Sequence, residues 1–249
     1  MEKQTSRGVL VTGASRGIGR AIAKAFADNG DRVAVHYSSR RAEAERTLSE
    51  LVGEGHVLIG GDVSDADEAA RIVDEAIAAL GQVHVLVNNA AVNLPHPLPS
   101  TDYKEWQRVW RQTVDVNLLG TANVSYCAAR HMIDNALPGR IVNIGSRGAF
   151  RGEPDHPAYG ATKAAAQALS QSLAVSLAPY GIGVASVAPG FVATERVADR
   201  VTDAIRAQSP FGRVAAPAEI ATAVRYLASP EAIWSSGTVL DANGASYLH

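Results

Sequence analysis

A glycine-rich turn between an apolar run and an alanine-rich run constrains the fold of this chain most. The apolar run Gly8-Val-Leu-Val-Thr12 is typical of a short buried strand. After the turn Gly13-Ala-Ser-Arg-Gly-Ile-Gly19, residues 21–30 have helical periodicity and end on a glycine suited to a helix C-cap. Glycines between a strand and a helix let the backbone approach a pyrophosphate at the positive helix N-terminus. The pattern predicts a dinucleotide-binding unit, with a chance glycine cluster as the alternative.

Apolar runs and helical runs alternate along the rest of the chain, which favours an α/β fold with a doubly wound sheet. Further strands are expected at 31–39, 56–60, 83–87, 140–145, 181–188 and 237–241. Helices are expected at 42–52, 65–80 and 103–135, from the region of Tyr159 to about 180, and at 217–229. No repeat, linker or second domain interrupts the pattern. We therefore expect one domain over residues 1–249.

Composition narrows the class of protein. With 249 residues, 47% of them hydrophobic, the chain can bury a large core. A net charge of −2 argues against a nucleic-acid partner. The single cysteine, Cys127, allows no internal disulfide, so we expect a cytoplasmic protein and a buried structural thiol. The seven histidines show no metal-ligand spacing, and neither a signal core nor a membrane-spanning run is evident.

Tyr159 and Lys163 are four residues apart on an expected helix, so their side chains share a face. A free phenol has a pKa of about 10, and a nearby ammonium favours the phenolate. Such a tyrosine can donate a proton to a carbonyl oxygen or accept one from an alcohol. Ser146, at the end of an expected strand, can hydrogen-bond the same oxygen. The alternative is that both residues decorate an exposed helix.

The segments Thr12-Gly-Ala-Ser-Arg-Gly-Ile-Gly19 and Tyr159-Gly-Ala-Thr-Lys163 together resemble the short-chain dehydrogenase/reductase family. The resemblance extends from about Val9 to Gly244, nearly the whole chain. It implies a single Rossmann-type domain with a doubly wound, mostly parallel sheet of seven strands and helices on both faces. It also implies a catalytic set of Asn117, Ser146, Tyr159 and Lys163. In that set Asn117 holds a relay water and Lys163 also holds the nicotinamide ribose.

The end of the second strand bears on cofactor choice. Dinucleotide folds that prefer NAD usually place an acidic residue there, but here His36-Tyr-Ser-Ser39 precedes Arg40. Arg16 adds a cation in the glycine turn. A missing carboxylate and added guanidinium groups favour the 2′-phosphate of NADP. NAD is the alternative cofactor. Arg40 also suits a solvated helix face.

The resemblance implies further cofactor contacts. The Asp62-Val63 pair would hold the adenine; the alternative is that Asp62 or Ser64 simply caps the next helix. Ala91 stands where the family usually has glycine. The cofactor-binding candidates are Gly13, Ser15, Arg16, Gly17, Ile18, Gly19, Ser38, Arg40, Asp62, Val63, Asn89, Ala90, Tyr159, Lys163, Pro189, Gly190, Val192 and Thr194.

The loop after Ser146 is expected to line the substrate pocket, and residues at about 190–211 are expected to form a lid. Phe150 could pack against substrate, and Arg147 or Arg151 could bind an acidic group, unless both arginines lie on the surface. His156 is expected to be a loop residue rather than a second catalytic acid.

These features favour an NADPH-dependent carbonyl reductase acting on a small-molecule ketone. A resemblance to β-ketoacyl carrier-protein reductases implies a 3-oxoacyl thioester. The alternatives are an oxidative alcohol, sugar or steroid dehydrogenase and a nucleotide-binding regulator without turnover. In the family, the helices holding Asn117 and Tyr159 pair between subunits, which implies a homotetramer.

Overall fold

The computed structural model describes residues 6–195 and 201–248. Seven strands in this part of the chain form one sheet, in the order β3-β2-β1-β4-β5-β6-β7, and every pairing is parallel. The expected doubly wound sheet is therefore confirmed. The strands are β1 (Gly8–Val11), β2 (Arg32–Tyr37), β3 (Val57–Gly60), β4 (Val85–Asn88), β5 (Arg140–Ile144), β6 (Gly183–Pro189) and β7 (Val239–Ala242).

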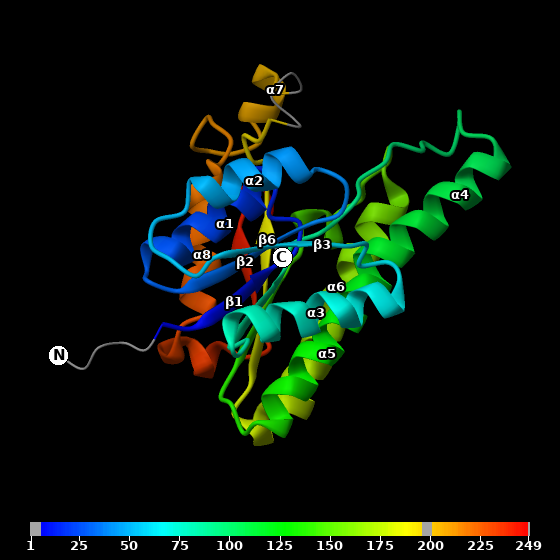
Figure 1. Ribbon diagram of the computed structural model, residues 1–249. Helices are drawn as coiled ribbons and strands as arrows, with labels where there is room; N and C mark the ends of the chain where they lie inside the picture. Colours follow the sequence, from blue (N-terminus) through cyan, green and yellow to red (C-terminus); the bar gives the residue numbers. More distant parts are fainter. Residues whose placement is uncertain (1–5, 196–200, 249) are drawn as a thin grey trace.

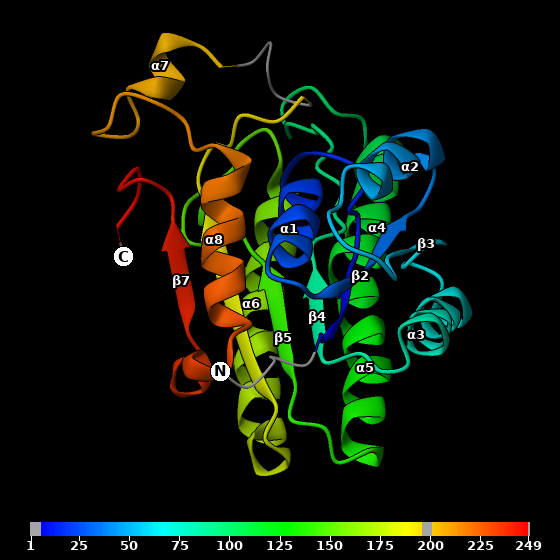
Figure 2. The ribbon, with the colours of Figure 1, turned by 60° about the vertical axis from the view of Figure 1, so that its left-hand side comes forward.

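Helices cover both faces of the sheet (Figures 1 and 2). Helices α1, α2 and α8 pack on one face, and α3, α5 and α6 pack on the other. The α-helices are α1 (Gly17–Asp28), α2 (Arg41–Ser49), α3 (Ala66–Leu80), α4 (Tyr103–Val114), α5 (Thr121–Asp134), α6 (Pro157–Leu177), α7 (Asp203–Arg206) and α8 (Pro217–Leu227). Shorter helical turns are η1 (Asp115–Gly120), η2 (Arg147–Ala149), η3 (Ala178–Tyr180) and η5 (Pro230–Ser235). Within the described residues, none of the helices has the length and apolarity needed to cross a membrane.

The first strand shows how the apolar runs build two cores. Successive side chains of a strand point to opposite faces, so Val9 and Val11 join the core under α1 and α8, while Leu10 joins the core under α3 and α5. All three side chains are fully buried. A parallel sheet covered on both faces needs such continuous apolar runs, because neither face of a central strand meets water.

The helical region expected at 103–135 contains a π-helical turn. Helix α4 leads into η1, which has π-helical hydrogen bonding, and α5 continues directly from it. A π-helical turn has a different hydrogen-bond spacing from an α-helix, and such turns are frequent at functional sites. Asn117 lies in this turn and is buried.

Candidate active site

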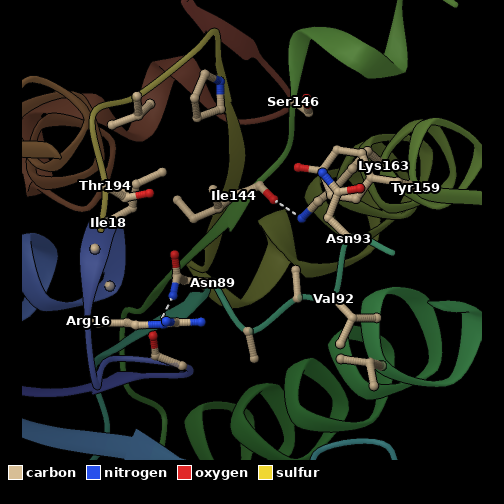
Figure 3. A pocket seen from close by; sticks show the side chains of 18 of the residues that line it. Arg16, Ile18, Asn89, Val92, Asn93, Ile144, Ser146, Tyr159, Lys163 and Thr194 are labelled. Carbon is tan, nitrogen blue, oxygen red and sulfur yellow. Dashed lines mark hydrogen bonds between the residues drawn. The ribbon is translucent and has the colours of Figure 1, made fainter. Parts of the chain in front are cut away.

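The carboxyl ends of the parallel strands meet along one edge of the sheet, and a cavity of about 560 Å³ opens there. Strand β1 lies between β2 and β4, so the chain leaves the centre of the sheet in opposite directions at this point. In open α/β sheets a crevice at such a point is the usual place for a bound ligand. Figure 3 shows the cavity from close by.

The cavity brings together all the cofactor candidates and most of the catalytic set. Its wall includes every residue named above as a cofactor-binding candidate, together with Ser146; Asn117 is not part of the wall. In Figure 3, Ser146, Tyr159, Lys163 and Asn93 lie on one side of the cavity. The side chains of Arg16, Ile18 and Thr194 lie on the opposite side.

The glycine turn is packed so closely that two of its positions exclude a side chain. A Cβ on Gly19 would lie 2.3 Å from the Gly13 carbonyl oxygen and 2.5 Å from Asn89 Nδ2. Gly13 has a φ of +63°, and a Cβ there would lie 2.9 Å from Ala90 Cα. The turn therefore leaves bare backbone at the N-terminus of α1, which fits a pyrophosphate group.

Hydrogen bonds from the loop after β4 hold this turn. The side-chain nitrogen of Asn89 donates to the carbonyl oxygens of Thr12 and Gly13, both at 2.9 Å. The Thr12 hydroxyl oxygen accepts the backbone N–H groups of Asn89 and Ala90 at 2.9 and 3.1 Å. Asn89 thus supports the turn at the sheet edge, and the Ala90 backbone lies beside it.

His36 joins the ends of β1, β2 and β3, a role that the sequence pattern did not reveal. The backbone N–H of Gly13 donates to His36 Nδ1 at 3.1 Å, so the ring proton lies on Nε2, which contacts the Gly61 carbonyl oxygen at 3.1 Å. Burial lowers the pKa of His36 to about 4, and the side chain is 1% exposed. A lone polar residue inside the apolar second strand was the only signal.

The end of the cavity nearest β2 carries the residues that follow this strand. Ser38 and Arg40 are exposed there, and Arg16 is half-buried at the N-cap of α1. Arg40 forms an ion pair with Glu43 at 3.0 Å, which lowers the pKa of that carboxyl. Accessible guanidinium groups at this end fit a phosphate.

Asp62 lines the cavity but does not cap the next helix. Its Oδ1 accepts the backbone N–H and the hydroxyl of Ser64, at 3.0 and 2.8 Å. Helix α3 is instead capped by Asp65, whose carboxylate accepts from the backbone of Asp67 and Glu68. The alternative that Asp62 or Ser64 caps the helix is therefore wrong, because the chain turns once more before α3 begins.

The proton-transfer candidates lie at the end of β5 and the start of α6. Lys163 is 4% exposed and donates from Nζ to the Ile144 carbonyl oxygen at 2.6 Å (Figure 3). The same nitrogen lies 5.7 Å from the ring centroid of Tyr159. Ser146 accepts the backbone N–H of Gly148 at 3.0 Å, which leaves its hydroxyl hydrogen free to point elsewhere. A phenol, a hydroxyl and an ammonium thus converge on one part of the cavity.

Asn117 acts on the neighbouring loop. Its Oδ1 accepts the backbone N–H of Val92 at 2.8 Å, and its Nδ2 donates to the Val92 carbonyl and to Thr162 Oγ1, at 3.0 and 3.2 Å. These contacts tie η1 to the loop after β4 and to α6. Both hydrogens of the side-chain amide are engaged within the protein, so its geometry is that of a positioning residue.

The loop after Ser146 differs in part from expectation. Arg147 is buried and lines the cavity, whereas Arg151 is exposed and lies outside it. Phe150 stacks on Tyr247, with ring centroids 6.5 Å apart, and is not part of the cavity wall. The expected contact of Phe150 with substrate is therefore not supported, because its ring packs against the C-terminal segment instead.

Two further polar residues line this cavity. His156 is 8% exposed and its Nδ1 has no hydrogen-bond partner among the described residues. Asn93 Oδ1, also in the cavity wall, is buried with no such partner in the same part of the chain. The sequence pattern did not identify Asn93 as a site residue, although it closely follows the Asn88–Asn89 turn at a strand end.

The described residues give little support to a nucleophilic cysteine or to a metal site. Burial raises the pKa of the Cys127 thiol, which disfavours the nucleophilic thiolate. In residues 6–195 and 201–248, no cluster of three or more His, Cys, Asp or Glu residues is arranged to hold a metal ion.

Comparison with known proteins agrees with this geometry. A family model described as enoyl-(acyl carrier protein) reductase matches residues 13–244. The chain is 36% identical over 248 residues to the 3-oxoacyl-[acyl-carrier-protein] reductase FabG of Staphylococcus aureus, covering 98% of this chain and 99% of that protein. It is 35% identical over 252 residues to an uncharacterized oxidoreductase of Methylorubrum extorquens (98% and 99% covered). It is 32% identical over 251 residues to a 3-oxoacyl-[acyl-carrier-protein] reductase of Synechocystis sp. (100% of both). The chain therefore belongs to the short-chain dehydrogenase/reductase family and is an NAD(P)-dependent oxidoreductase that acts on CH–OH and C=O groups.

Proposed function

We propose that the protein is an NADPH-dependent carbonyl reductase that reduces a ketone. One observation carries the proposal: a single cavity joins the bare glycine turn at one end to Ser146, Tyr159 and Lys163 at the other. Such a cavity can hold a dinucleotide and a small carbonyl compound together.

The residues present fit a nicotinamide dinucleotide. The turn of Gly13, Gly17 and Gly19 would hold the pyrophosphate, and Arg16, Ser38 and Arg40 would bind the 2′-phosphate of NADP. At the other end, Val192 and Thr194 would bind the carboxamide. A bound nicotinamide supplies the hydride that the protein side chains lack.

The side chains at the catalytic end then orient the substrate and move a proton. Ser146 and Tyr159 hydrogen-bond the carbonyl oxygen, and Tyr159 donates its proton to that oxygen. Lys163, fixed by its bond to the Ile144 carbonyl, holds its positive charge beside the phenol. Asn117 positions the loop at Val92 and, in this proposal, maintains the relay water. In the oxidative direction the same groups would serve an alcohol, which keeps an alcohol, sugar or steroid dehydrogenase as the second candidate.

For the substrate we propose a ketone of the 3-oxoacyl type. The names of the Staphylococcus aureus and Synechocystis relatives, both 3-oxoacyl-[acyl-carrier-protein] reductases, support a 3-oxoacyl thioester. Residues 190–211 are proposed as the lid over the substrate. The described part of this segment includes α7, and residues 196–200 lie outside the described residues.

We further propose a homotetramer in the cytoplasm. Tyr126 on α5 and Val175 on α6 are 67% and 79% exposed, so large side chains on these helices are available to a second copy. Light scattering checks this assembly: a tetramer is expected, and a monomer at micromolar concentration would contradict it. The single cysteine agrees with a reducing compartment.

The proposed function is tested by fluorescence titration with NADPH and NADH, followed by turnover on ketones. The panel includes a 3-oxoacyl thioester and a cyclic ketone. We expect NADPH to bind more tightly and to support reduction. Preferred NADH binding would contradict the assigned phosphate ligands. Tight cofactor binding without turnover of any ketone or alcohol would favour the nucleotide-binding regulator.

A further inference from the structure

Arg147 directly follows Ser146 and is an unusually buried cation. It begins η2 and is 5% exposed. Its backbone carbonyl accepts the N–H of Phe150, so the residue is fixed at the entrance of the loop beside the catalytic end. A guanidinium in such a place is costly unless the protein or a ligand compensates its charge.

Among the described residues, the partners of this guanidinium are neutral. Nη1 donates to Ser246 Oγ at 2.6 Å, Nη2 donates to Gln208 Oε1, and the group lies 5.1 Å from the ring centroid of Phe191. A guanidinium has five N–H donors, so these two bonds leave three without a partner in the described part of the chain. Among those residues it also forms no ion pair. Burial and the positive charge of Arg151 lower the pKa of this group, and the negative charge of Glu153 raises it.

The position of Arg147 makes these donors useful to a ligand. It lines the large cavity and also a second cavity of about 310 Å³. Phe191 borders both cavities as well, and Gln208 and Ser246 border the second. Both of these partners lie near the carboxyl edge of the sheet, just after α7 and β7, whose positions Figure 2 shows. The guanidinium therefore lies in the wall between the catalytic end and an adjoining space.

We propose that Arg147 binds a carboxylate of the substrate, so that the preferred substrates are oxo acids rather than uncharged ketones. Arginine presents paired N–H groups that match the two oxygens of a carboxylate, and its charge offsets that of the acid in a buried place. This inference rests on the proposed reduction of a ketone, since it places the acid group close to Ser146. A 3-oxoacyl thioester carries no such charge, so the oxo acid and the thioester are competing candidates for the substrate of the same ketone site.

A purely structural role for Arg147 is the competing explanation. In that case its bonds to Gln208 and Ser246 clamp the C-terminal segment onto the active-site loop, and its charge has no ligand. The two explanations differ in substrate dependence. Loss of a clamp weakens catalysis with every ketone, whereas loss of a carboxylate ligand weakens it with acids only.

The kinetic test compares 2-, 3- and 4-oxo acids with their own methyl esters. For the wild type we expect kcat/KM to favour at least one acid over its ester by about tenfold or more. Arg147→Gln should lower kcat/KM for that acid by on the order of 10²-fold and change the ester only a few-fold, in line with the loss of a buried charge-assisted pair. Arg151→Gln, which removes the same charge from the exposed part of the loop, should change neither. Ser246→Ala should keep the acid preference.

Equal losses for acid and ester in Arg147→Gln, or a wild type without acid preference, would overturn the proposal. If Arg147→Gln does not fold, Arg147→Lys replaces it. Because lysine keeps the charge but not the paired donors, it should retain part of the acid preference. An acid preference unchanged from wild type in the lysine variant, or absent from it, would count against recognition by the guanidinium.

A binding measurement separates this inference from the proposed function. Calorimetry on the enzyme–NADPH complex uses saturated carboxylic acids of the same lengths and their methyl esters, none of which can be reduced. We expect the wild type and Tyr159→Phe to bind an acid more tightly than its ester, and Arg147→Gln to lose that difference. If this holds while no ketone is reduced, the carboxylate site stands and the reductase proposal fails. If ketones are reduced but acids and esters bind equally, the carboxylate site fails alone.

Discussion

In the proposed function, single residues in the glycine turn leave the helix N-terminus open to a dinucleotide. Gly19 has no room for a side chain, because the carbonyl oxygen of Gly13 and the amide of Asn89 occupy the space. Any larger residue must push the turn away from the loop after β4. In the proposed function, this close backbone packing bears directly on cofactor binding.

The substitution Gly19→Ala is therefore expected to weaken NADPH binding by at least tenfold. The added methyl group should also lower the free energy of unfolding by about 1–3 kcal/mol, as overpacking typically does. Fluorescence titration and urea unfolding measure the two effects. Gly30→Ala is the control, because a Cβ at Gly30 meets nothing within 4 Å, although its φ of +85° carries a strain of its own. NADPH binding at wild-type strength in Gly19→Ala would refute the assigned role.

Ser38 offers a direct test of cofactor preference. In Ser38→Asp, a carboxylate stands after β2, where dinucleotide folds that use NAD place one. We expect NADPH affinity to fall by about tenfold or more through charge repulsion, and NADH affinity to rise. Titration with both cofactors provides the measurement, with Ser39→Asp as a neighbouring control. Unchanged selectivity would show that the 2′-phosphate is bound elsewhere.

At the scale of secondary-structure elements, buried polar bonds hold the strand ends in register. Asn88 Nδ2 on β4 donates to Asn143 Oδ1 on β5 at 2.8 Å, and Asn143 Nδ2 donates to Ser170 Oγ on α6 at 2.6 Å. Ser186 on β6 donates to the same hydroxyl at 2.8 Å. This series of hydrogen bonds fixes α6, and with it Lys163, against three strands, because each of these buried polar groups finds a partner within the series.

His36 performs a similar task for β1, β2 and β3, and its burial makes stability depend on pH. Its pKa is about 4 in the folded protein, against an ordinary value of 6.5, so only the unfolded chain takes up this proton between those values. The contribution of neutral His36 to the free energy of unfolding is complete above pH 6.5 and is lost as the pH falls towards 4. At about 1.4 kcal/mol per pH unit, the loss across the window is about 3 kcal/mol.

The measurement is urea unfolding without cofactor at about pH 7.5 and about pH 4.5. His36→Asn keeps a side-chain acceptor for the Gly13 N–H but does not titrate. The variant should be less stable at the higher pH and should lose about 3 kcal/mol less than the wild type on acidification. His84 and His131, whose pKa values burial also lowers, are present in both proteins. Equal losses in the two proteins would contradict a buried neutral His36.

Local patterns predicted the elements well and long-range contacts poorly. The apolar runs at 8–12 and 140–145 became β1 and β5 because a buried parallel strand is a continuous apolar run. The π-helical turn at Asn117 was not predicted, since apolar periodicity does not report a local change of hydrogen-bond spacing. The bonds of His36 and the burial of Arg147 depend on segments up to 99 residues away, about which the local sequence says nothing.

At the scale of the whole molecule, the parallel sheet creates the site. Since every strand runs in the same direction, loops from six strands meet at one edge and contribute to one cavity. The turn after β1 and the Tyr159–Lys163 pair on α6 are far apart in sequence but line the same cavity. The central claim is that this arrangement lets Tyr159 donate a proton to a ketone beside bound NADPH.

Tyr159→Phe tests that claim most directly. The variant removes only the phenolic oxygen, so Kd for NADPH should stay within about twofold of wild type. The value of kcat for ketone reduction should fall by about 10²–10⁴-fold, the usual contribution of a general acid. Tyr180→Phe, at a tyrosine that is 53% exposed and outside the cavity, is the control and should leave both values unchanged. Ketone reduction at the wild-type rate in Tyr159→Phe would contradict the account.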